Sequence, residues 1–171
     1  ARRRGATILA EVLGAGSSMD AWNPTAPHPE GLGAERAMRR ALKDASISPS
    51  QVDYVNAHGT GTPLGDVAES QAIYRVCGDT VSVSSIKGAV GHCIAAAGAV
   101  EAVACVGMLS EGWVAGTTGL ATPDSACPTK NLLEPSPIAP QVIVSNSFGF
   151  GGQNASLVFS TVEFADGQSS N

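Results

Sequence analysis

The sequence predicts an α/β domain with a largely parallel sheet covered by helices on its faces. Strand-like runs alternate with helical segments between residues 7 and 109, an order typical of parallel strands joined by crossover helices. With 171 residues and 43% hydrophobic content, the chain is long enough for one domain with its own core. We expect this domain to cover residues 1–165 and to be followed by a disordered tail over residues 166–171.

The first elements alternate as this fold class requires. Residues 7–13 (TILAEVL) predict a strand, followed by a Gly-, Ser- and Pro-rich connection over residues 14–33. Residues 34–45 predict an amphipathic helix, because apolar side chains recur at helical spacing between basic ones. A short strand over residues 52–57 then leads into a glycine-rich turn over 58–65. The next helix has Asp66 in its first turn, where a carboxylate meets the positive end of the helix.

The second half continues the alternation with a strand over residues 81–84 and a long helix over 91–109. This helical segment belongs to the most apolar stretch of the chain, but it contains His92 and Glu101. Ionisable groups are costly in a bilayer, so we expect a buried helix rather than a membrane span. A loop over 112–140 precedes two closing strands over 141–145 and 155–159, joined by a turn around 148–152.

Charge and cysteine content narrow the class of protein. The net charge is -5, and the run Arg2 to Arg4 is too short to form a basic stripe for nucleic acid. The four cysteines form no C-x-x-C pair and lie at no zinc-ligand spacing with a histidine. With no signal-peptide pattern, we expect reduced thiols and a cytoplasmic protein. The start at Ala1 rather than Met indicates a cleaved, trimmed or incomplete product.

Three segments place polar or glycine-rich clusters directly after predicted strands, where open α/β sheets bind their ligands. They are residues 56–66 (NAHGTGTPLGD), 84–101 (SSIKGAVGHCIAAAGAVE) and 146–154 (NSFGFGGQN). Singly, each has a structural explanation. A lone histidine after a strand is commonly a hydrogen-bonded structural residue, and the first segment lacks the Gly-Lys-Ser/Thr ending of a P-loop. Lys87 and His92 are explained equally well as a surface charge and a helix cap.

Together, in this order and at these spacings, the segments resemble the signature segments of the β-ketoacyl synthases of the thiolase-like superfamily. The resemblance covers nearly the whole chain. It implies the C-terminal half of the duplicated α-β-α-β-α fold, with a mixed, mostly parallel sheet. The implied activity is that of a KAS II-like 3-oxoacyl-[acyl-carrier-protein] synthase, an acyltransferase that condenses malonyl and acyl thioesters with decarboxylation. The resemblance implies no metal or redox cofactor and leaves fatty acid, polyketide and aryl polyene products open.

The resemblance also assigns catalytic roles to three residues. It implies that His58 and His92, as neutral imidazoles, donate hydrogen bonds to the malonyl thioester carbonyl. Such preorganised donors lower the barrier to forming an enolate, by about 3 kcal/mol each. Lys87 is implied to orient the second histidine and to supply positive potential. Because an unpaired buried cation is expensive, we expect Glu101 to pair with Lys87.

Further residues are implied to bind and enclose the substrate. Thr60 and Thr62 match the hydroxyls that bind the phosphopantetheine arm of the acyl carrier protein. Phe150 resembles the gating phenylalanine at the acyl pocket, whose backbone N–H completes an oxyanion hole. Gly149 and Gly151 beside it leave φ and ψ unrestricted, so the loop is expected to swing. Structural roles in turns and helix starts are expected for Asp66, Asn146 and Asn154.

The nucleophilic cysteine of the family belongs to the other half of the fold. We expect all four cysteines here to be structural or incidental, with Cys93 inside the helix after His92 and its side chain directed away from the histidine. The expected partners are therefore an N-terminal half that carries the cysteine, an acyl carrier protein, and a second subunit in a homo- or heterodimer. A chain-length-factor-like subunit, a scaffold and an inactive fragment are the alternatives. The set His58, Lys87 and His92 argues against the first of them.

Overall fold

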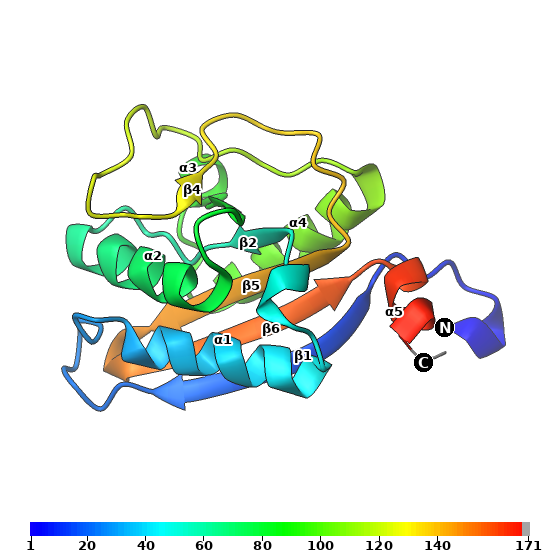
Figure 1. Ribbon diagram of the computed structural model, residues 1–171, viewed down its shortest axis with the longest axis horizontal. Coiled ribbons are helices and arrows are strands. Elements are labelled where there is room, and N and C mark those ends of the chain that lie inside the picture. The colour runs from blue at the N-terminus through cyan, green and yellow to red at the C-terminus, as the bar shows by residue number, and fades with distance from the viewer. Residues whose placement is uncertain (169–171) are drawn as a thin grey trace.

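In the computed structural model, which describes residues 1–168, six strands form one sheet in the order β1-β6-β5-β2-β3-β4 (Figure 1). Strand β6 runs antiparallel to its neighbours β1 and β5, whereas β5, β2, β3 and β4 run parallel to one another. The predicted mixed, mostly parallel sheet is confirmed. The strands are β1 (Glu11–Met19), β2 (Tyr54–Asn56), β3 (Ser82–Ser84), β4 (Lys130–Asn131), β5 (Val142–Gly149) and β6 (Gln153–Ser160).

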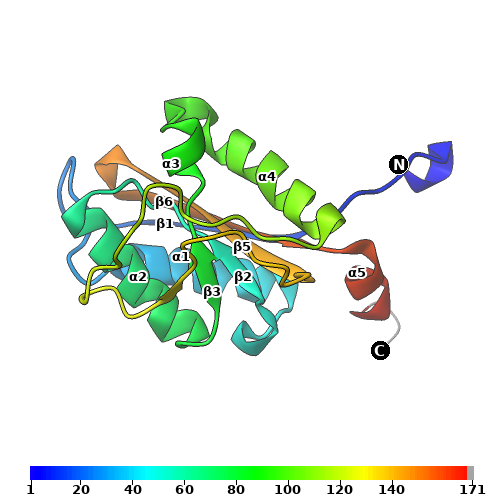
Figure 2. The ribbon, with the colours of Figure 1, turned by 90° about the horizontal axis from the view of Figure 1, so that it is seen from above.

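Helices cover both faces of this sheet. Figure 2 shows α1 (Leu32–Ala45) and α2 (Pro63–Cys77) on one face, and α3 (Lys87–Val90) and α4 (Ala97–Glu111) on the other. The chain closes with α5 (Val162–Gln168). Short 3-10 turns are η1 (Arg2–Arg4), η2 (Pro49–Gln51), η3 (Ile94–Ala96) and η4 (Phe150–Gly152).

The core has two layers because alternate strand residues point to opposite faces. On β5, Val142 and Val144 pack in the layer beneath α1 and α2, together with Val55 of β2. Ile143 of β5 packs on the other face against the α4 side chains, and so does Tyr54. The sheet is thus buried on both faces, as the fold class requires.

The first strand differs from the predicted one. We expected it over residues 7–13, but β1 spans Glu11–Met19 and pairs with β6 along its length. Its glycines explain the error, because Gly weakens the local strand signal. They are needed for close packing on α1: a Cβ atom on Gly16 would lie 2.1 Å from the carbonyl oxygen of Ala37.

The long helix predicted over residues 91–109 is broken into α3, η3 and α4. Gly91 and Ile94 have φ angles of 77° and 50°, which no α-helix tolerates. By length and composition alone, the segment Ile94–Glu111 could cross a membrane, with a mean hydropathy of 1.5, and 28% of it is buried inside the fold. Its buried face, centred on Glu101 and Cys105, packs on the sheet. The expectation of a buried helix therefore holds for one face of α4.

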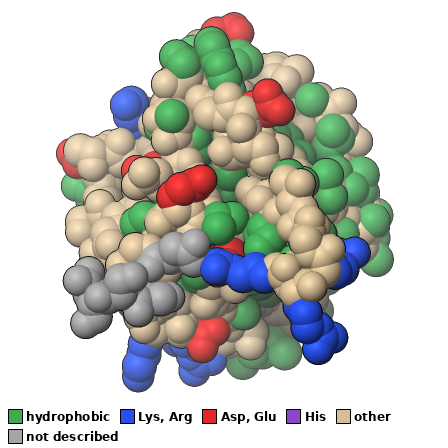
Figure 3. All heavy atoms as spheres, turned by 90° about the vertical axis from the view of Figure 1, so that its right-hand side faces the viewer, with side chains coloured by type: hydrophobic (Ala, Val, Ile, Leu, Met, Phe, Trp, Pro, Cys, Tyr) green, Lys and Arg blue, Asp and Glu red, His purple; other side chains and the backbone are tan. Residues whose placement is uncertain are grey.

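The predicted tail over residues 166–171 overlaps the end of the fold. Helix α5 extends to Gln168, so residues 166–168 are helical, and residues 169–171 lie outside the described part of the chain. On the face shown in Figure 3, basic and acidic side chains lie at separate places among hydrophobic and neutral ones.

Candidate active site

The turn after β2 carries His58 and leads into α2. Gly59 has a φ of 38°, in the left-handed region that glycine adopts most readily. The carboxylate of Glu69, on the second turn of α2, accepts hydrogen bonds from the backbone N–H groups of His58 and Gly59, each at 2.9 Å. The histidine-bearing turn is therefore fastened to the helix that follows it.

The segment after β3 carries Lys87 and His92. Lys87 begins the single turn α3, and His92 lies between α3 and η3. The backbone N–H of Ile94 donates to Nδ1 of His92 at 3.2 Å. An Nδ1 atom that accepts a hydrogen bond carries no proton, so a neutral His92 bears its proton on Nε2.

Lys87 and Glu101 form a buried ion pair, as the need for a counter-charge predicts. The two side chains are 6% and 2% exposed, and the Lys87 ammonium donates to Oε1 of Glu101. Burial raises the pKa of Glu101, and the bond from Lys87 acts against that rise. The pair joins the start of α3 to α4, so it links the two helices on this face of the sheet.

The rings of His58 and His92 meet edge to face, with centroids 5.5 Å apart. Burial, and after it the positive charge of Lys87, lowers the pKa of His58 to about 3. His58 is therefore neutral at physiological pH. Its buried Nδ1 atom has no hydrogen-bond partner among residues 1–168, and Oδ1 of Asn56 is likewise unpartnered there.

The third segment forms the turn between β5 and β6 and lies next to His58. The ring of Phe148 lies 5.7 Å from that of His58, centroid to centroid. Phe150 is 79% exposed. The N–H of Gly151 donates to the carbonyl of Pro24 at 2.7 Å, so the turn is held by the β1–α1 loop. Gly151 has a φ of 80°, whereas Gly149 is extended.

One cavity of about 670 Å³ collects most of the predicted site residues. His58 and His92 line it together with side chains from all three segments and from the β1–α1 loop. Its lining includes Thr60, Thr62, Phe148, Gly149, Phe150 and Pro27. The hydroxyls of Thr60 and Thr62 lie 3.1 Å apart. The three segments predicted from sequence thus converge on one space.

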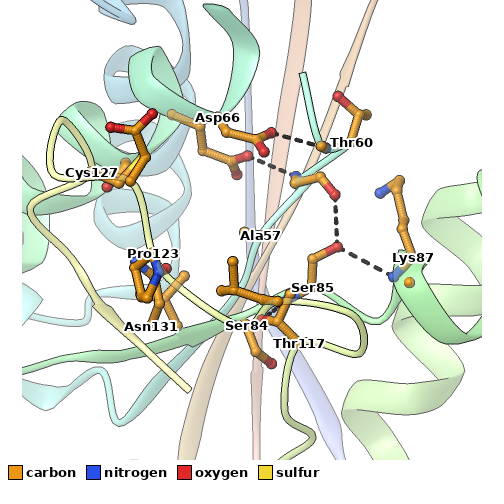
Figure 4. A pocket seen from close by; sticks show the side chains of 18 of the residues that line it. Ala57, Thr60, Asp66, Ser84, Ser85, Lys87, Thr117, Pro123, Cys127 and Asn131 are labelled. Atoms are coloured by element: carbon orange, nitrogen blue, oxygen red, sulfur yellow. Dashed lines mark hydrogen bonds between the residues drawn. The ribbon is translucent and has the colours of Figure 1, made fainter. Parts of the chain in front are cut away.

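Lys87 and Thr60 border a second cavity of about 540 Å³ (Figure 4), and this cavity also reaches His92. This space lies between α2 and the loop that follows α4, with Cys127 in its wall. Lys87 is thus close to His92 without lining the cavity that holds both histidines. No group of three or more His, Cys, Asp or Glu side chains within the described residues is arranged as a metal site.

Sequence reasoning missed two residues at this site. Glu69 lies next to the apolar stripe of α2, and its spacing from His58 gave no signal of their contact. Burial raises the pKa of Glu69. The Nδ2 atom of Asn146 donates a hydrogen bond to the Glu69 carboxylate at 3.1 Å. From the sequence, Phe148 was interpreted only as part of a glycine-rich turn, but its ring contacts His58. The structural role expected of Asn146 fits its bonds to Glu69 and Ser156.

The cysteines stand apart from the histidine cavity. Burial raises the pKa of Cys105 to about 12 and that of Cys77 to about 11, and it also raises the pKa of Cys127. Such thiols are protonated at neutral pH and are poor nucleophiles. The expected place of Cys93 inside a helix is wrong, because Cys93 precedes η3. It does not line either cavity.

The fold and the three converging segments define a ketosynthase half-domain, and comparison with known proteins agrees. Residues 9–121 match the family described as "Beta-ketoacyl synthase, C-terminal domain". That match covers more than half of the chain, so the chain belongs to this family. The predicted family is confirmed.

Named relatives are condensing enzymes. The chain is 45% identical over 163 residues to the chloroplastic 3-oxoacyl-[acyl-carrier-protein] synthase II of Arabidopsis thaliana. It is 43% identical over 166 residues to 3-oxoacyl-[acyl-carrier-protein] synthase 2 of Coxiella burnetii. These matches cover 93% and 95% of this chain but 30% and 40% of the relatives. The chain therefore spans well under half of their length.

Solved structures confirm the thiolase-like fold. A ketosynthase and chain length factor of ishigamide synthesis matches with a TM-score of 0.89 and 37% identity. A type II PKS ketosynthase, in complex with its acyl-carrier protein, matches with a TM-score of 0.91 and 34% identity. Each covers 94% of this chain and 40% of the other.

Proposed function

We propose that this chain is the histidine and lysine half of a 3-oxoacyl-[acyl-carrier-protein] synthase. The observation that carries the proposal is the edge-to-face pair of His58 and His92 on one cavity, with rings 5.5 Å apart. Two nitrogens that each donate to one oxygen from about 2.9 Å are at most about 5.8 Å apart. Rings whose centroids are 5.5 Å apart can each bring one nitrogen within that range, and we propose that the two rings bind a single thioester carbonyl.

The proposed step is the decarboxylation of a malonyl thioester. The bond to the carboxylate breaks, carbon dioxide leaves, and the electron pair moves into an enolate whose oxygen takes up negative charge. A low pKa keeps His58 neutral, and the Ile94 N–H leaves the proton of His92 on Nε2. Both rings then act as fixed N–H donors, which stabilise the enolate without gaining or losing a proton.

The second step joins the two carbon chains. The enolate carbon attacks the carbonyl of an acyl group held on a cysteine, a carbon–carbon bond forms, and the cysteine thiolate leaves. We propose that Lys87 raises the local positive potential, that Thr60 and Thr62 bind the phosphopantetheine arm, and that Phe150 gates the acyl pocket. The reaction is redox-neutral, and we propose that it proceeds without a redox cofactor or metal.

The nucleophilic cysteine is proposed to come from an N-terminal half, in the same polypeptide or on a partner chain. This chain corresponds to 30–40% of the length of its relatives. It exposes apolar side chains on α4 and η3, where Val103 and Ile94 are exposed by 74% and 75% and Ile94 also lines the histidine cavity. An exposed apolar face of this kind favours a covering partner. We propose that the N-terminal half covers this face and places its cysteine at the histidine cavity.

The test uses the native protein that contains both halves, with malonyl-acyl carrier protein as the substrate. His58→Ala and His92→Ala should each lower the rate of carbon dioxide release by about 10²–10³-fold. Acyl transfer to the cysteine should continue in both variants, and mass spectrometry measures it. His28→Ala is the matched control, because His28 does not line the histidine cavity.

A non-condensing subunit is the second candidate, because one of the similar structures contains a chain length factor beside the ketosynthase. Such a subunit shapes a pocket and needs no pair of N–H donors. A scaffold that serves only dimerisation likewise needs no such pair. Unchanged carbon dioxide release in the His58→Ala and His92→Ala proteins would therefore replace the condensing role by one of these.

A further inference from the structure

Ser85 is a buried residue, 5% exposed, at the junction of three chain segments. Its hydroxyl donates to the carbonyl oxygen of Gly59 at 3.0 Å and accepts from the backbone N–H of Lys87 at 3.3 Å (Figure 4). Its own backbone N–H donates to the hydroxyl of Thr117 at 3.3 Å. One side chain thus contacts the turn that carries His58 and the first turn of α3.

The Gly59 peptide groups are held on both sides. The N–H of Gly59 donates to Glu69, and its carbonyl accepts from Ser85. The packing is equally close, since a Cβ atom on Gly59 would lie 2.6 Å from Cβ of Ser85. Because Gly59 directly follows His58, these contacts fix the backbone from which the His58 ring projects.

Few hydrogen bonds join the two histidine-bearing segments beyond the paired strands. The register of β2 and β3 ends at Asn56 and Ser84. Within the described residues, the bonds that continue from residues 57–62 to residues 84–92 are Ala57 N–H to the Ser84 carbonyl and Ser85 hydroxyl to the Gly59 carbonyl. The Lys87–Glu101 pair does not substitute for them, because it ties α3 to α4 on the other side.

We propose that Ser85 is a positioning residue that sets the place of His58 relative to Lys87 and His92. The inference rests on the proposed function of the two histidines. Loss of the hydroxyl frees the Gly59 carbonyl and the Lys87 N–H together, so the two segments lose their side-chain link. A displacement of about 1 Å between groups that bind one transition state costs up to about 10²-fold in rate.

The variant is Ser85→Ala, with Ser70→Ala as the matched control. Ser70 is also buried, at 6% exposed, and its hydroxyl also joins two segments through Thr129. Both variants lose one buried hydroxyl, so a fall in melting temperature alone does not separate positioning from structure. We expect Ser85→Ala to lower kcat for malonyl-acyl carrier protein decarboxylation by about 10- to 100-fold with KM nearly unchanged. Ser70→Ala should keep the parental kcat.

A second variant and a second readout protect the test. Ser85→Cys keeps a side-chain donor at this position, although a weaker and somewhat larger one, so its kcat should lie between the parental value and that of Ser85→Ala. Nitrogen NMR of the His58 and His92 rings should show shifted signals in Ser85→Ala and unshifted ones in Ser70→Ala. Parental kcat with unmoved ring signals in both Ser85 variants would overturn the positioning role. An equal loss of kcat in Ser70→Ala would overturn it too.

The two proposals fail in different ways. If His58→Ala and His92→Ala abolish decarboxylation while the Ser85 variants leave it intact, the catalytic role of the histidines stands and the positioning role is refuted. If the histidine variants leave decarboxylation intact, the proposed function itself is refuted.

Discussion

Removal of one partner of the Lys87–Glu101 pair will destabilise the protein more than removal of both. The side chains are 6% and 2% exposed, so each charge has lost nearly all of its hydration. Glu101→Gln leaves the ammonium buried without its carboxylate, and Lys87→Met does the reverse. A buried charge that loses its partner costs about 3–5 kcal/mol, whereas replacement of both charges by apolar groups of similar size is often neutral or stabilising.

The assay is urea unfolding of the native protein at neutral pH, followed by circular dichroism. Each single variant should lose about 3–5 kcal/mol, a large share of the roughly 5–15 kcal/mol that stabilises a typical domain. The double variant Lys87→Met with Glu101→Leu should lose much less than the sum of about 6–10 kcal/mol for independent sites. A double variant that loses the full sum would refute the coupling.

Three further predictions concern the histidine turn and the thiols. The pKa of His58 is lowered to about 3 in the folded protein, so the unfolded chain binds a proton at His58 at a higher pH than the folded protein does. The contribution of His58 to the free energy of unfolding is therefore constant above about pH 6.5 and falls by up to about 1.4 kcal/mol per pH unit as the pH drops toward 3. His58→Gln should flatten this slope in acid unfolding, and an unchanged slope would contradict the assignment. Gly59→Ala should destabilise the protein by clearly more than about 1 kcal/mol, because its Cβ meets Ser85. Gly61 has a φ of 77° but open space around it, so calorimetry should find a smaller loss of stability for Gly61→Ala. Equal losses of stability in the two variants would rule out the clash. Iodoacetamide mapping by mass spectrometry should find Cys105 the slowest thiol, owing to its burial and its pKa of about 12, and early labelling there would disprove this.

The alternation of strands and helices followed from the sequence, but strand β4 lies in the predicted loop over residues 112–140, and the edges of the elements depended on tertiary contacts. Hydrophobic periodicity predicted α1 within two residues of its start at Leu32. The strand β1 was predicted too early, because Gly14 and Gly16 weaken the pattern where it pairs with β6. Both glycines are required by the distance to α1, a property of packing that local sequence does not carry.

The break before α4 shows a second limit. Gly91 is a visible helix breaker, but Ile94 is β-branched and disfavours a positive φ. Its φ of 50° accompanies the hydrogen bond from its N–H to His92. Backbone strain of this kind is found at functional sites, and propensity rules applied to a run of small residues predict a continuous helix instead.

The site itself was predictable to the extent that it follows from strand order. His58 follows β2 and Lys87 follows β3, and these parallel neighbours end side by side at Asn56 and Ser84. Phe148 belongs to β5, which pairs with β2 on its other side. Adjacent parallel strands bring their carboxyl ends to one edge, so three segments distant in sequence meet there.

What the sequence did not carry is the support that sets the distances within this edge. Glu69 and Ser85 reach the Gly59 peptide groups from opposite sides, one from a helix and one from a strand end. Neither residue type is distinctive at its position, because a glutamate on a helix and a serine after a strand usually face solvent. Their burial follows only once the parallel strands are paired and α2 is packed. The chemistry is thus encoded in short motifs, whereas the geometry that makes those motifs work is encoded in the fold.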